Sequence, residues 1–229
     1  MAPSDKTVLD GMHVVVTAGG TREPIDPVRY LGNRSSGKMG NSLAEAAVAL
    51  GATVTLITTV DAPHAVPRLH VVRVNTADEM LHAVHDALPD AALLLMAAAV
   101  ADYRPVRALP SKLKKRAQPW SLDLVPTVDI LTSLRDLPAR RGTLVVGFAA
   151  ETEDLLANAQ TKLAQKGLDL IVVNDVSRSD IAMGSDANEV TIIDRAGVVA
   201  HIARAPKTKV AQSILRIVVA RLRGAQVGR

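Results

Sequence analysis

Short runs of β-branched and aliphatic residues alternate along this chain with longer segments in which apolar residues recur at helical spacing. The apolar runs occupy residues 13–18, 53–58, 91–100, 143–148 and 168–174. The segments with helical spacing occupy residues 35–50, 77–88 and 153–166. Continuous apolar runs of this length are typical of strands buried on both faces, and their alternation with helices is typical of parallel sheets. The pattern therefore predicts an α/β fold, a Rossmann-like three-layer domain with a mainly parallel sheet.

Two later segments depart from this alternation. Residues 103–141 combine prolines, a basic run and few apolar positions, and an irregular stretch of this length inside a compact domain is usually a functional flap. Residues 189–202 contain two strand-like runs around a short turn, which predicts a β-hairpin at the edge of the sheet. Residues 207–223 predict a closing helix. We expect one domain over residues 11–229, preceded by a linker or tail over residues 1–10.

The first helix is expected to begin within the stretch "GNRSSGKM" (residues 32–39). Ser35 or Ser36 is the expected N-cap, and Gly51 is the expected stop. The spelling G-x-x-x-x-G-K matches the phosphate-binding P-loop, but Met39 stands where that pattern needs Ser or Thr. The glycines of a P-loop also follow their strand directly, whereas about fourteen residues intervene here. A P-loop is therefore not expected, although the helix start remains a predicted anion site.

Composition and charge narrow the classes of function. The chain is 48% hydrophobic but has one Trp, two Tyr and one Phe, so its core must be aliphatic. The absence of cysteine excludes disulfides, cysteine-ligated zinc and a cysteine nucleophile in this chain. We interpret His82 and His85 as surface residues rather than metal ligands. With 27 basic and 23 acidic residues and no apolar run of membrane-spanning length, we expect a cytoplasmic protein that binds neither nucleic acid nor membrane.

Candidate binding residues follow the ends of predicted strands or lie in the flap. Asp102 follows a strand, where ligands of open parallel sheets bind, although it could instead cap a turn. Phe148 ends another strand and is either a ligand contact or a core aromatic. Lys162 and Lys166 share one helix face and are either ligand contacts or surface residues. Lys112 opens the basic run "KLKKR", where an ammonium group could close over a bound phosphate.

A series of motifs, taken in chain order, resembles one family. The series is "GGTREPIDPVRYLGNRSSGKMG", "AAVADYRP", "KLKK", "DIL", "GFAAET", K-x-x-x-K and "NDVS". It resembles phosphopantothenoylcysteine synthetase (phosphopantothenate-cysteine ligase) of the bacterial CTP-dependent type, and the likeness extends over residues 11–223. The resemblance implies that the carboxylate of 4′-phosphopantothenate attacks the α-phosphate of CTP and releases pyrophosphate. The amino group of L-cysteine would then displace CMP from the acyl-cytidylate, a step toward coenzyme A.

The resemblance also implies roles for individual residues. Asn33 and Lys112 are expected to be catalytic, Asn33 at the acyl group and Lys112 at both the nucleotide and the intermediate. The residues expected around CTP are Ala98, Asp102, Lys112, Val128, Asp129, Ile130, Leu131, Phe148, Lys162 and Lys166. The residues expected around the phosphopantothenoyl group are Arg29, Asn33, Ser35, Ser36, Gly37, Ala98 and Ala99. Mg²⁺ is expected to accompany the triphosphate, with no protein ligand assigned.

The resemblance leaves some features open. The family usually has Asn-Pro-Asp-Ile where this chain has Thr127-Val128-Asp129-Ile130, so contacts to the base are less secure there. The family forms homodimers, for which the edge hairpin is a candidate contact. In many bacteria the ligase follows a flavin-dependent decarboxylase domain, so the chain is either a stand-alone ligase or a fragment, with no flavin of its own. The main alternative is an NAD(P)-dependent oxidoreductase, and the second is a non-catalytic nucleic-acid or nucleotide-binding protein.

Overall fold

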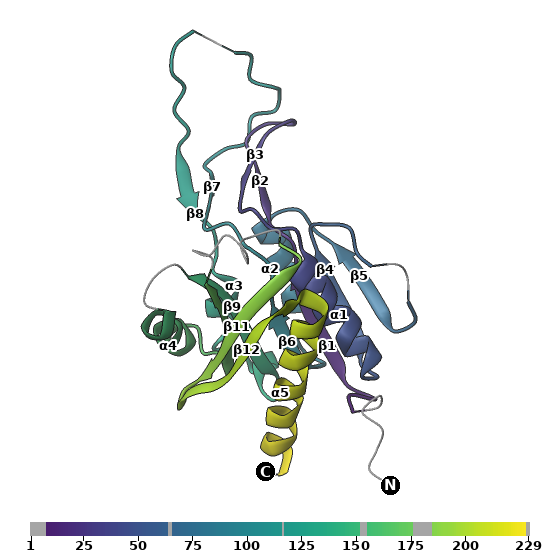
Figure 1. The fold of residues 1–229 in the computed structure, drawn as a ribbon. Helices are drawn as coiled ribbons and strands as arrows, with labels where there is room; N and C mark the ends of the chain where they lie inside the picture. The colour runs from purple at the N-terminus through teal and green to yellow at the C-terminus, as the bar shows by residue number, and fades with distance from the viewer. Residues whose placement is uncertain (1–7, 64–65, 116, 152–154, 176–184, 228–229) are drawn as a thin grey trace.

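A computed structural model describes residues 8–63, 66–115, 117–151, 155–175 and 185–227. Its centre is an eight-stranded sheet in the order β12-β11-β10-β9-β6-β1-β4-β5 (Figure 1). The strands of this sheet are β1 (His13–Ala18), β4 (Thr53–Thr58), β5 (Leu69–Arg73), β6 (Ala91–Met96), β9 (Leu144–Glu151), β10 (Leu170–Asp175), β11 (Ala187–Asp194) and β12 (Gly197–Pro206). The helices are α1 (Lys38–Ala49), α2 (Ala77–Ala87), α3 (Ile130–Leu134), α4 (Leu155–Gln165) and α5 (Lys207–Val227), with a short 3₁₀ turn, η2 (Pro138–Arg140).

The strand order explains where a ligand site is to be sought. In this sheet the neighbouring strands β5, β4, β1, β6, β9 and β10 pair in parallel, whereas β10 with β11 and β11 with β12 pair antiparallel. The chain first builds outward from β1 through β4 to β5 and then crosses to β6 on the other side of β1. Ligands of such sheets bind beyond the carboxyl ends of the strands where the order reverses, here between β1 and β6. The predicted α/β class, mainly parallel sheet and edge hairpin are confirmed.

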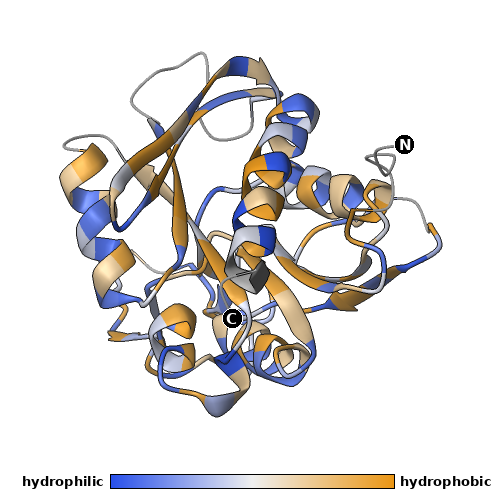
Figure 2. Cartoon of the chain, turned by 90° about the horizontal axis from the view of Figure 1, so that it is seen from below, coloured by the Kyte–Doolittle hydropathy of each residue, from blue (hydrophilic) through white to orange (hydrophobic). Residues whose placement is uncertain are grey.

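Side chains that alternate along each strand build two cores, one on each face of the sheet. Val14 and Val16 of β1 belong to the first core with residues of α1 and α5, whereas Val15 belongs to the second with residues of α2, α3 and α4. Figure 2 shows hydrophobic strands between helices that carry both hydrophobic and hydrophilic residues. Because the buried side chains are mostly Val, Leu, Ile and Ala, the expected aliphatic core is also confirmed.

Several expected boundaries were wrong or incomplete. The folded part extends before residue 11, because Leu9 is fully buried and its backbone N–H donates to the Leu50 carbonyl at 2.9 Å. Strand β5 was not predicted, since it lies at the sheet edge with mostly exposed residues. Strand β6 ends at Met96 rather than at residue 100. The backbone N–H of Ala98 then donates to Thr17 Oγ1 at 3.1 Å, which turns the chain along the end of β1.

The expected serine N-cap of the first helix was also wrong. Helix α1 is capped by Gly37, whose φ of 71° is left-handed and whose place has no side-chain cap hydrogen bond. Ser35 Oγ instead accepts a long hydrogen bond of 3.4 Å from the Gly37 N–H, so this serine stabilises the turn before the helix. Gly51 follows the last turn with φ 95°, in agreement with the predicted helix stop.

Two small antiparallel ribbons project from the carboxyl end of the sheet (Figure 1). One pairs β2 (Arg22–Pro24) with β3 (Tyr30–Gly32), and the other pairs β7 (Tyr103–Pro105) with β8 (Leu124–Pro126). The predicted flap is therefore partly regular: it contains the second ribbon and then α3 and η2. The loop between β7 and β8 remains without a helix or strand in its described residues. This loop, residues 106–123, is the part of the predicted flap that connects β7 to β8, and the name flap refers to it alone from here on.

Candidate functional site

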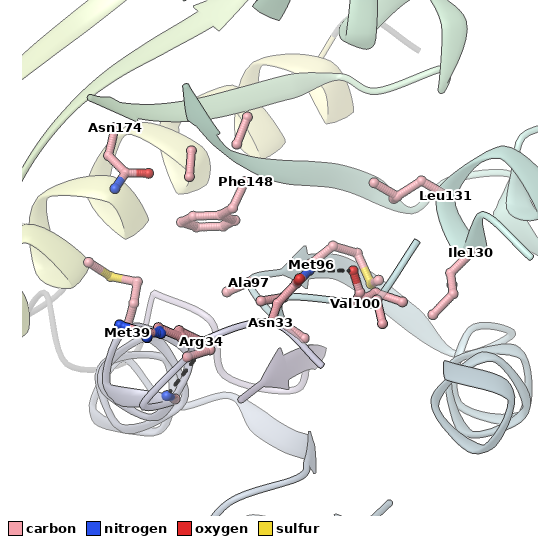
Figure 3. A pocket seen from close by; sticks show the side chains of 18 of the residues that line it. Asn33, Arg34, Met39, Met96, Ala97, Val100, Ile130, Leu131, Phe148 and Asn174 are labelled. Atoms are coloured by element: carbon pink, nitrogen blue, oxygen red, sulfur yellow. Dashed lines mark hydrogen bonds between the residues drawn. The ribbon is translucent and has the colours of Figure 1, made fainter. Parts of the chain in front are cut away.

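A cavity of about 570 Å³ opens beyond the carboxyl ends of the parallel strands (Figure 3). Four continuous segments line it: residues 33–40, 96–102, 127–131 and 148–150. Five single residues complete the described lining, namely Lys162, Lys166, Asn174, Asn188 and Lys207. The cavity therefore lies at the point where the strand order reverses, and its volume is that of a site for a small molecule or cofactor.

Most of the residues to which the sequence gave a role meet at this cavity. Those that line it are Asn33, Ser35, Ser36, Gly37, Ala98, Ala99, Asp102, Val128, Asp129, Ile130, Leu131, Phe148, Lys162 and Lys166. Arg29 and Lys112 are not among its described lining residues. Both belong to the projecting part of the molecule, Arg29 at the hairpin turn and Lys112 in the exposed flap. The structure thus divides the expected site into a cavity and two cationic residues outside it.

The floor of the cavity is made of backbone and small side chains. Thr21 Oγ1 accepts a hydrogen bond of 2.9 Å from the Ala101 N–H, and Gly20 forms an isolated parallel bridge with Ala99. Asn33 is held over this floor, because its Nδ2 donates to the Val100 carbonyl at 3.0 Å (Figure 3). The amide side chain therefore has a fixed orientation, while a second Nδ2 hydrogen remains for another acceptor.

The start of α1 approaches the end of β1 very closely. A Cβ on Gly40 would lie 2.6 Å from the Ala18 Cβ, and a Cβ on Gly37 would lie 2.3 Å from a methyl carbon of Val60. Only glycine allows this packing, and at Gly37 the left-handed backbone favours glycine as well. Gly37 and Gly40 therefore bring the first turn of a twelve-residue helix to the cavity wall. Amide N–H groups of a first helical turn favour anions.

In a second wall, one ion pair joins the N-cap of α3 to the turn after α4. Asp129 caps α3 by accepting a hydrogen bond of 3.0 Å from the Thr132 N–H, and its other oxygen lies 2.9 Å from Lys166 Nζ. Burial works against the charge of Asp129, but the hydrogen bonds from Thr132 and Lys166 hold its pKa below the usual value. Asp129 is therefore a structural carboxylate that orients a cavity lysine.

A third wall carries two further lysines that sequence reasoning did not select. Lys38 Nζ lies 2.5 Å from Asp186 Oδ1, and Lys207 Nζ donates to the Ser185 carbonyl at 2.5 Å. Burial and, next, the Lys38 ammonium lower the pKa of Lys207, whereas Asp186 acts in the opposite direction. The hydrogen bond from Lys38 in turn lowers the pKa of Asp186. Two cations thus lie close together here with one exposed carboxylate between them.

Phe148 and Asn174 project toward the cavity from the neighbouring strands β9 and β10 (Figure 3). Phe148 is partly buried and packs against the first core, and it also lines the cavity. Asn174 had no predicted role, although its position at the carboxyl end of a buried strand is close to the signal that selected Asp102. Asn188 and Lys207 had no comparable signal, because they come from the antiparallel edge strand β11 and from the start of α5.

The described residues contain no group of three or more His, Asp or Glu side chains arranged to hold a metal ion. His82 and His85 lie on α2 and do not line the cavity within the described part of the chain. No helix among the described residues is long and apolar enough to cross a bilayer.

Comparisons with known proteins agree on one family. Residues 9–222 match the family described as the C-terminal domain of the DNA/pantothenate metabolism flavoprotein. The chain is 42% identical over 215 residues to the coenzyme A biosynthesis bifunctional protein CoaBC of Bacillus subtilis, covering 93% of this chain and 52% of that protein. It is 39% identical over 209 residues to a cysteine/cysteine sulfinic acid decarboxylase of an unknown prokaryotic organism, covering 91% of this chain and 58% of that protein.

A solved structure agrees with these sequence matches. The crystal structure of the C-terminal domain of a coenzyme A biosynthesis bifunctional protein CoaBC is 36% identical and superposes with a TM-score of 0.78. The match covers 95% of this chain and 99% of that domain. The chain spans little more than half the length of the two relatives, so it corresponds to one part of them. The chain belongs to the family of the DNA/pantothenate metabolism flavoprotein C-terminal domain.

Proposed function

We propose that this chain is a phosphopantothenate-cysteine ligase. It would join 4′-phosphopantothenate to L-cysteine at the expense of CTP, in coenzyme A biosynthesis. The observation that carries the proposal is the cavity at the strand-order reversal, where Asn33, Asp102 and Lys166 meet from segments far apart in the chain. The similarity over the whole length of a CoaBC C-terminal domain supports the same activity.

The charge of the cavity suits the first half-reaction. A substrate carboxylate must attack the α-phosphate of a triphosphate, so two anions that repel each other have to be held in line. Lys162 belongs to α4 and Lys166 follows its last residue on one face of the sheet, whereas Lys38 and Lys207 begin α1 and α5 on the other. These cations and the first turn of α1 would screen the phosphates. The new bond between the carboxylate oxygen and the α-phosphorus replaces the bond from that phosphorus to pyrophosphate, which leaves with its electron pair.

The geometry of Asn33 suits the second half-reaction. The cysteine amine adds to the acyl carbon, negative charge develops on the acyl oxygen, and CMP leaves as the amide forms. Asn33 would donate a hydrogen bond to that oxygen, because its Nδ2 is already oriented by the Val100 carbonyl and does not have to reorganise. Lys112 would contribute from the flap, outside the cavity, at both the nucleotide and the intermediate.

The remaining residues are proposed to contact either the nucleotide or the phosphopantothenoyl group. Phe148, Asp102 and the backbone of residues 128–131 would contact the nucleotide. Ser35, Ser36, Gly37, Ala98, Ala99 and Arg29 would surround the phosphopantothenoyl group. We further propose that the protein acts as a cytoplasmic homodimer, and that a flavin-dependent decarboxylase domain accompanies the ligase in a longer protein, as the bifunctional name of the relatives suggests.

Mg²⁺ fits the cavity if the phosphates of CTP supply most of its ligands. Mg²⁺ commonly uses one or two carboxylates together with substrate phosphates, and the cavity lining contains the carboxylates Asp102 and Asp129. Because Asp129 already pairs with Lys166, Asp102 is the carboxylate that would face the ion or its waters. Bound there, Mg²⁺ would neutralise phosphate charge while the chain's own lysines orient the phosphoryl group.

A coupled pyrophosphate assay tests the proposal. Pyrophosphate should appear only when CTP and phosphopantothenate are both present, and CMP release should then require cysteine. The same assay with ATP, GTP and UTP measures the choice of nucleotide. Release of pyrophosphate without phosphopantothenate, or none with both substrates, would contradict the proposal. No specific observation favours an NAD(P)-dependent oxidoreductase, and titration with NADH or NADPH should therefore leave the nicotinamide fluorescence unchanged.

A further inference from the structure

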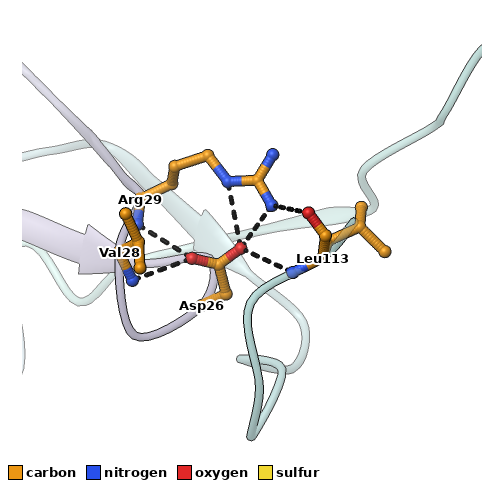
Figure 4. A network of polar contacts seen from close by, with 4 residues as sticks. All are labelled: Asp26, Val28, Arg29 and Leu113. Atoms are coloured by element: carbon orange, nitrogen blue, oxygen red, sulfur yellow. Dashed lines mark hydrogen bonds and ion pairs between the residues drawn. The ribbon is translucent and has the colours of Figure 1, made fainter. Parts of the chain in front are cut away.

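Asp26, which lies outside the cavity, has its carboxylate fully engaged in hydrogen bonds. Its side chain has 0% exposure although it lies at the turn of the projecting β2–β3 hairpin. Oδ1 accepts from the backbone N–H groups of Val28 and Arg29 at 2.8 and 2.9 Å. Oδ2 accepts from the Arg29 guanidinium, at 3.0 Å from Nε and 2.5 Å from Nη2, and from the Leu113 N–H at 3.2 Å (Figure 4). Burial of a charge is unfavourable, and the charge-assisted hydrogen bonds from these donors offset that cost.

The network connects two segments that are far apart in the sequence. Asp26 and Leu113 are 87 positions apart, and Arg29 Nη2 also donates to the Leu113 carbonyl at 2.9 Å. Both backbone groups of Leu113 are therefore held by the hairpin (Figure 4). A second link lies close by, because the Leu109 N–H donates to the Ile25 carbonyl at 2.9 Å. The flap is thus fixed to the hairpin immediately beside Lys112.

The base of the hairpin is fixed to the domain in turn. Glu23 is 2% exposed, and its carboxylate accepts a hydrogen bond of 2.8 Å from the Ala77 N–H at the start of α2. The Arg22 N–H donates to the Asn75 carbonyl at 2.8 Å, and the Arg22 guanidinium lies 5.5 Å from the centre of the Tyr30 ring. The hairpin therefore acts as an arm that connects the sheet domain to the flap.

The charge of Asp26 is required for this arrangement. The hydrogen bond from the Arg29 side chain lowers the pKa of Asp26 far below its usual value, although burial works in the opposite direction. Each carboxylate oxygen already accepts from at least two donors. An asparagine here would direct its NH₂ group at two donors in one orientation and at three in the other, which leaves hydrogen bonds unmade.

We propose that Asp26 is a positioning residue for the flap. Through Arg29 and the backbone of Leu113 it fixes the flap on the hairpin and thereby sets the place from which Lys112 acts. The flap-anchoring half of this inference concerns the free protein, whereas the kinetic half rests on the proposed ligase activity. The two halves are therefore measured separately.

The first experiment measures flap order in the absence of substrate. Trypsin can cleave after Lys112, Lys114 and Lys115, which are all exposed. In Asp26→Asn we expect cleavage there to accelerate by about tenfold, the factor that corresponds to loss of one charge-assisted hydrogen bond, with faster deuterium exchange in the peptide around Leu113. The matched control is Asp10→Asn, because Asp10 also pairs with an arginine, Arg68 at 2.7 Å, but before the start of β1. Equal cleavage of wild type and Asp26→Asn would overturn the proposal.

The second experiment asks whether Asp26 acts through Lys112. Rates of pyrophosphate release are compared for wild type, Asp26→Asn, Lys112→Gln and the double variant, each at saturating substrates. We expect kcat to fall by about tenfold or more in Asp26→Asn, and the double variant to be no slower than Lys112→Gln alone, because residues that act as a unit are non-additive. Additive losses would show that Asp26 acts elsewhere and would refute the positioning role.

A general folding defect gives a different result from loss of the anchor. Asp26 lies outside both hydrophobic cores, so Asp26→Asn should unfold within a few degrees of the wild-type Tm. Arg29→Gln provides a second variant for the protease measurement alone, since it removes the guanidinium contact to the Leu113 carbonyl and should also release the flap. If the wild type itself lacks ligase activity, the proposed function is wrong. The anchoring of the flap is still tested in that case, because tryptic cleavage and deuterium exchange do not depend on the activity.

Discussion

Lys166 Nζ lies 2.9 Å from Asp129 Oδ2, and this ion pair joins the turn after α4 to the N-cap of α3 at the wall of the cavity. One oxygen of Asp129 caps the helix while the other orients the lysine. The lysine is consequently held beside the cavity before any ligand binds. Preorganised charge of this kind avoids the cost of ordering a flexible side chain when the ligand arrives.

Loss of the Lys166 ammonium should weaken nucleotide binding. For Lys166→Gln we expect the KM for CTP to rise by about tenfold, the usual effect of removing one charged hydrogen bond to phosphate, with the KM for cysteine nearly unchanged. Lys209→Gln is the matched control, because Lys209 is an exposed lysine of α5 outside the described cavity lining. Steady-state kinetics with each substrate varied in turn makes the measurement. An unchanged KM for CTP would remove Lys166 from the nucleotide site.

The Asp129–Lys166 pair should also appear in the pH dependence of stability. The pKa of Asp129 is lower in the folded protein than its usual value of 3.8. Its contribution is therefore fully present above about pH 5 and disappears as the pH falls through the folded pKa. Both groups are partly exposed, so we expect less than about 1 kcal/mol.

Asp129→Asn isolates this contribution, since asparagine is as good an N-cap as aspartate. Chemical denaturation of both proteins should give a constant difference in unfolding free energy from about pH 5 to 7 and a smaller difference near pH 3. A difference that grows as the pH falls would contradict the assignment.

Asn33 should matter mainly for the cysteine step. In Asn33→Asp we expect the rate of the amide-forming step to fall by a factor of about 10²–10³, as for removal of one oxyanion donor, while pyrophosphate release is reduced much less. Rapid-quench measurement of pyrophosphate and CMP in one reaction separates the two steps. If both products slow equally, the assumed contact of Asn33 with the acyl oxygen is wrong.

Gly37 should tolerate no side chain, for reasons of both backbone and space. Its φ is 71°, and a Cβ there would lie 2.3 Å from a Val60 methyl carbon. Gly37→Ala should lower the free energy of unfolding by about 2–4 kcal/mol, of which backbone strain supplies about 1 kcal/mol and the clash the rest. Gly142→Ala is the control, because Gly142 has φ 91° but nothing within 4 Å of an added Cβ. Equal losses in the two variants would show that the clash relaxes without cost.

Removing a positive and removing a negative charge at the third wall should have opposite effects on the affinity for anions. Lys207→Gln removes a partly buried cation, whereas Asp186→Asn removes the carboxylate that competes for Lys38. At low salt we expect weaker binding of pyrophosphate in the first variant and binding about two- to threefold tighter in the second, a small effect because Asp186 is 88% exposed. Calorimetric titration measures both. Weaker binding in Asp186→Asn would mean that Asp186 orients the lysines rather than competing with the ligand.

Much of the fold could be predicted because its signals are local. The buried run of β1 and the helical spacing of α2 depend on neighbouring positions, and the structure has them almost where the sequence expected them. The boundaries that failed depended on distant contacts. Strand β6 ends early because Thr17 takes the Ala98 N–H, and α1 is capped by Gly37 because its first turn must pack against β1.

The candidate site likewise has residues that a local sequence signal indicates and residues that only distant contacts bring together. Position after a strand end favoured a binding role for Asp102, since the carboxyl ends of parallel strands share one edge of the sheet, whereas Phe148 was assigned to the nucleotide only by the family resemblance. The sequence by itself therefore determined the α/β architecture, the general place of the site and many of its residues. Only the tertiary structure decided that Lys38 meets Asp186, 148 positions away, and that Arg29 holds the flap at Leu113 from outside the described cavity lining. Contacts of this kind depend on strand order and on the paths of loops, and no local pattern of residues encodes them.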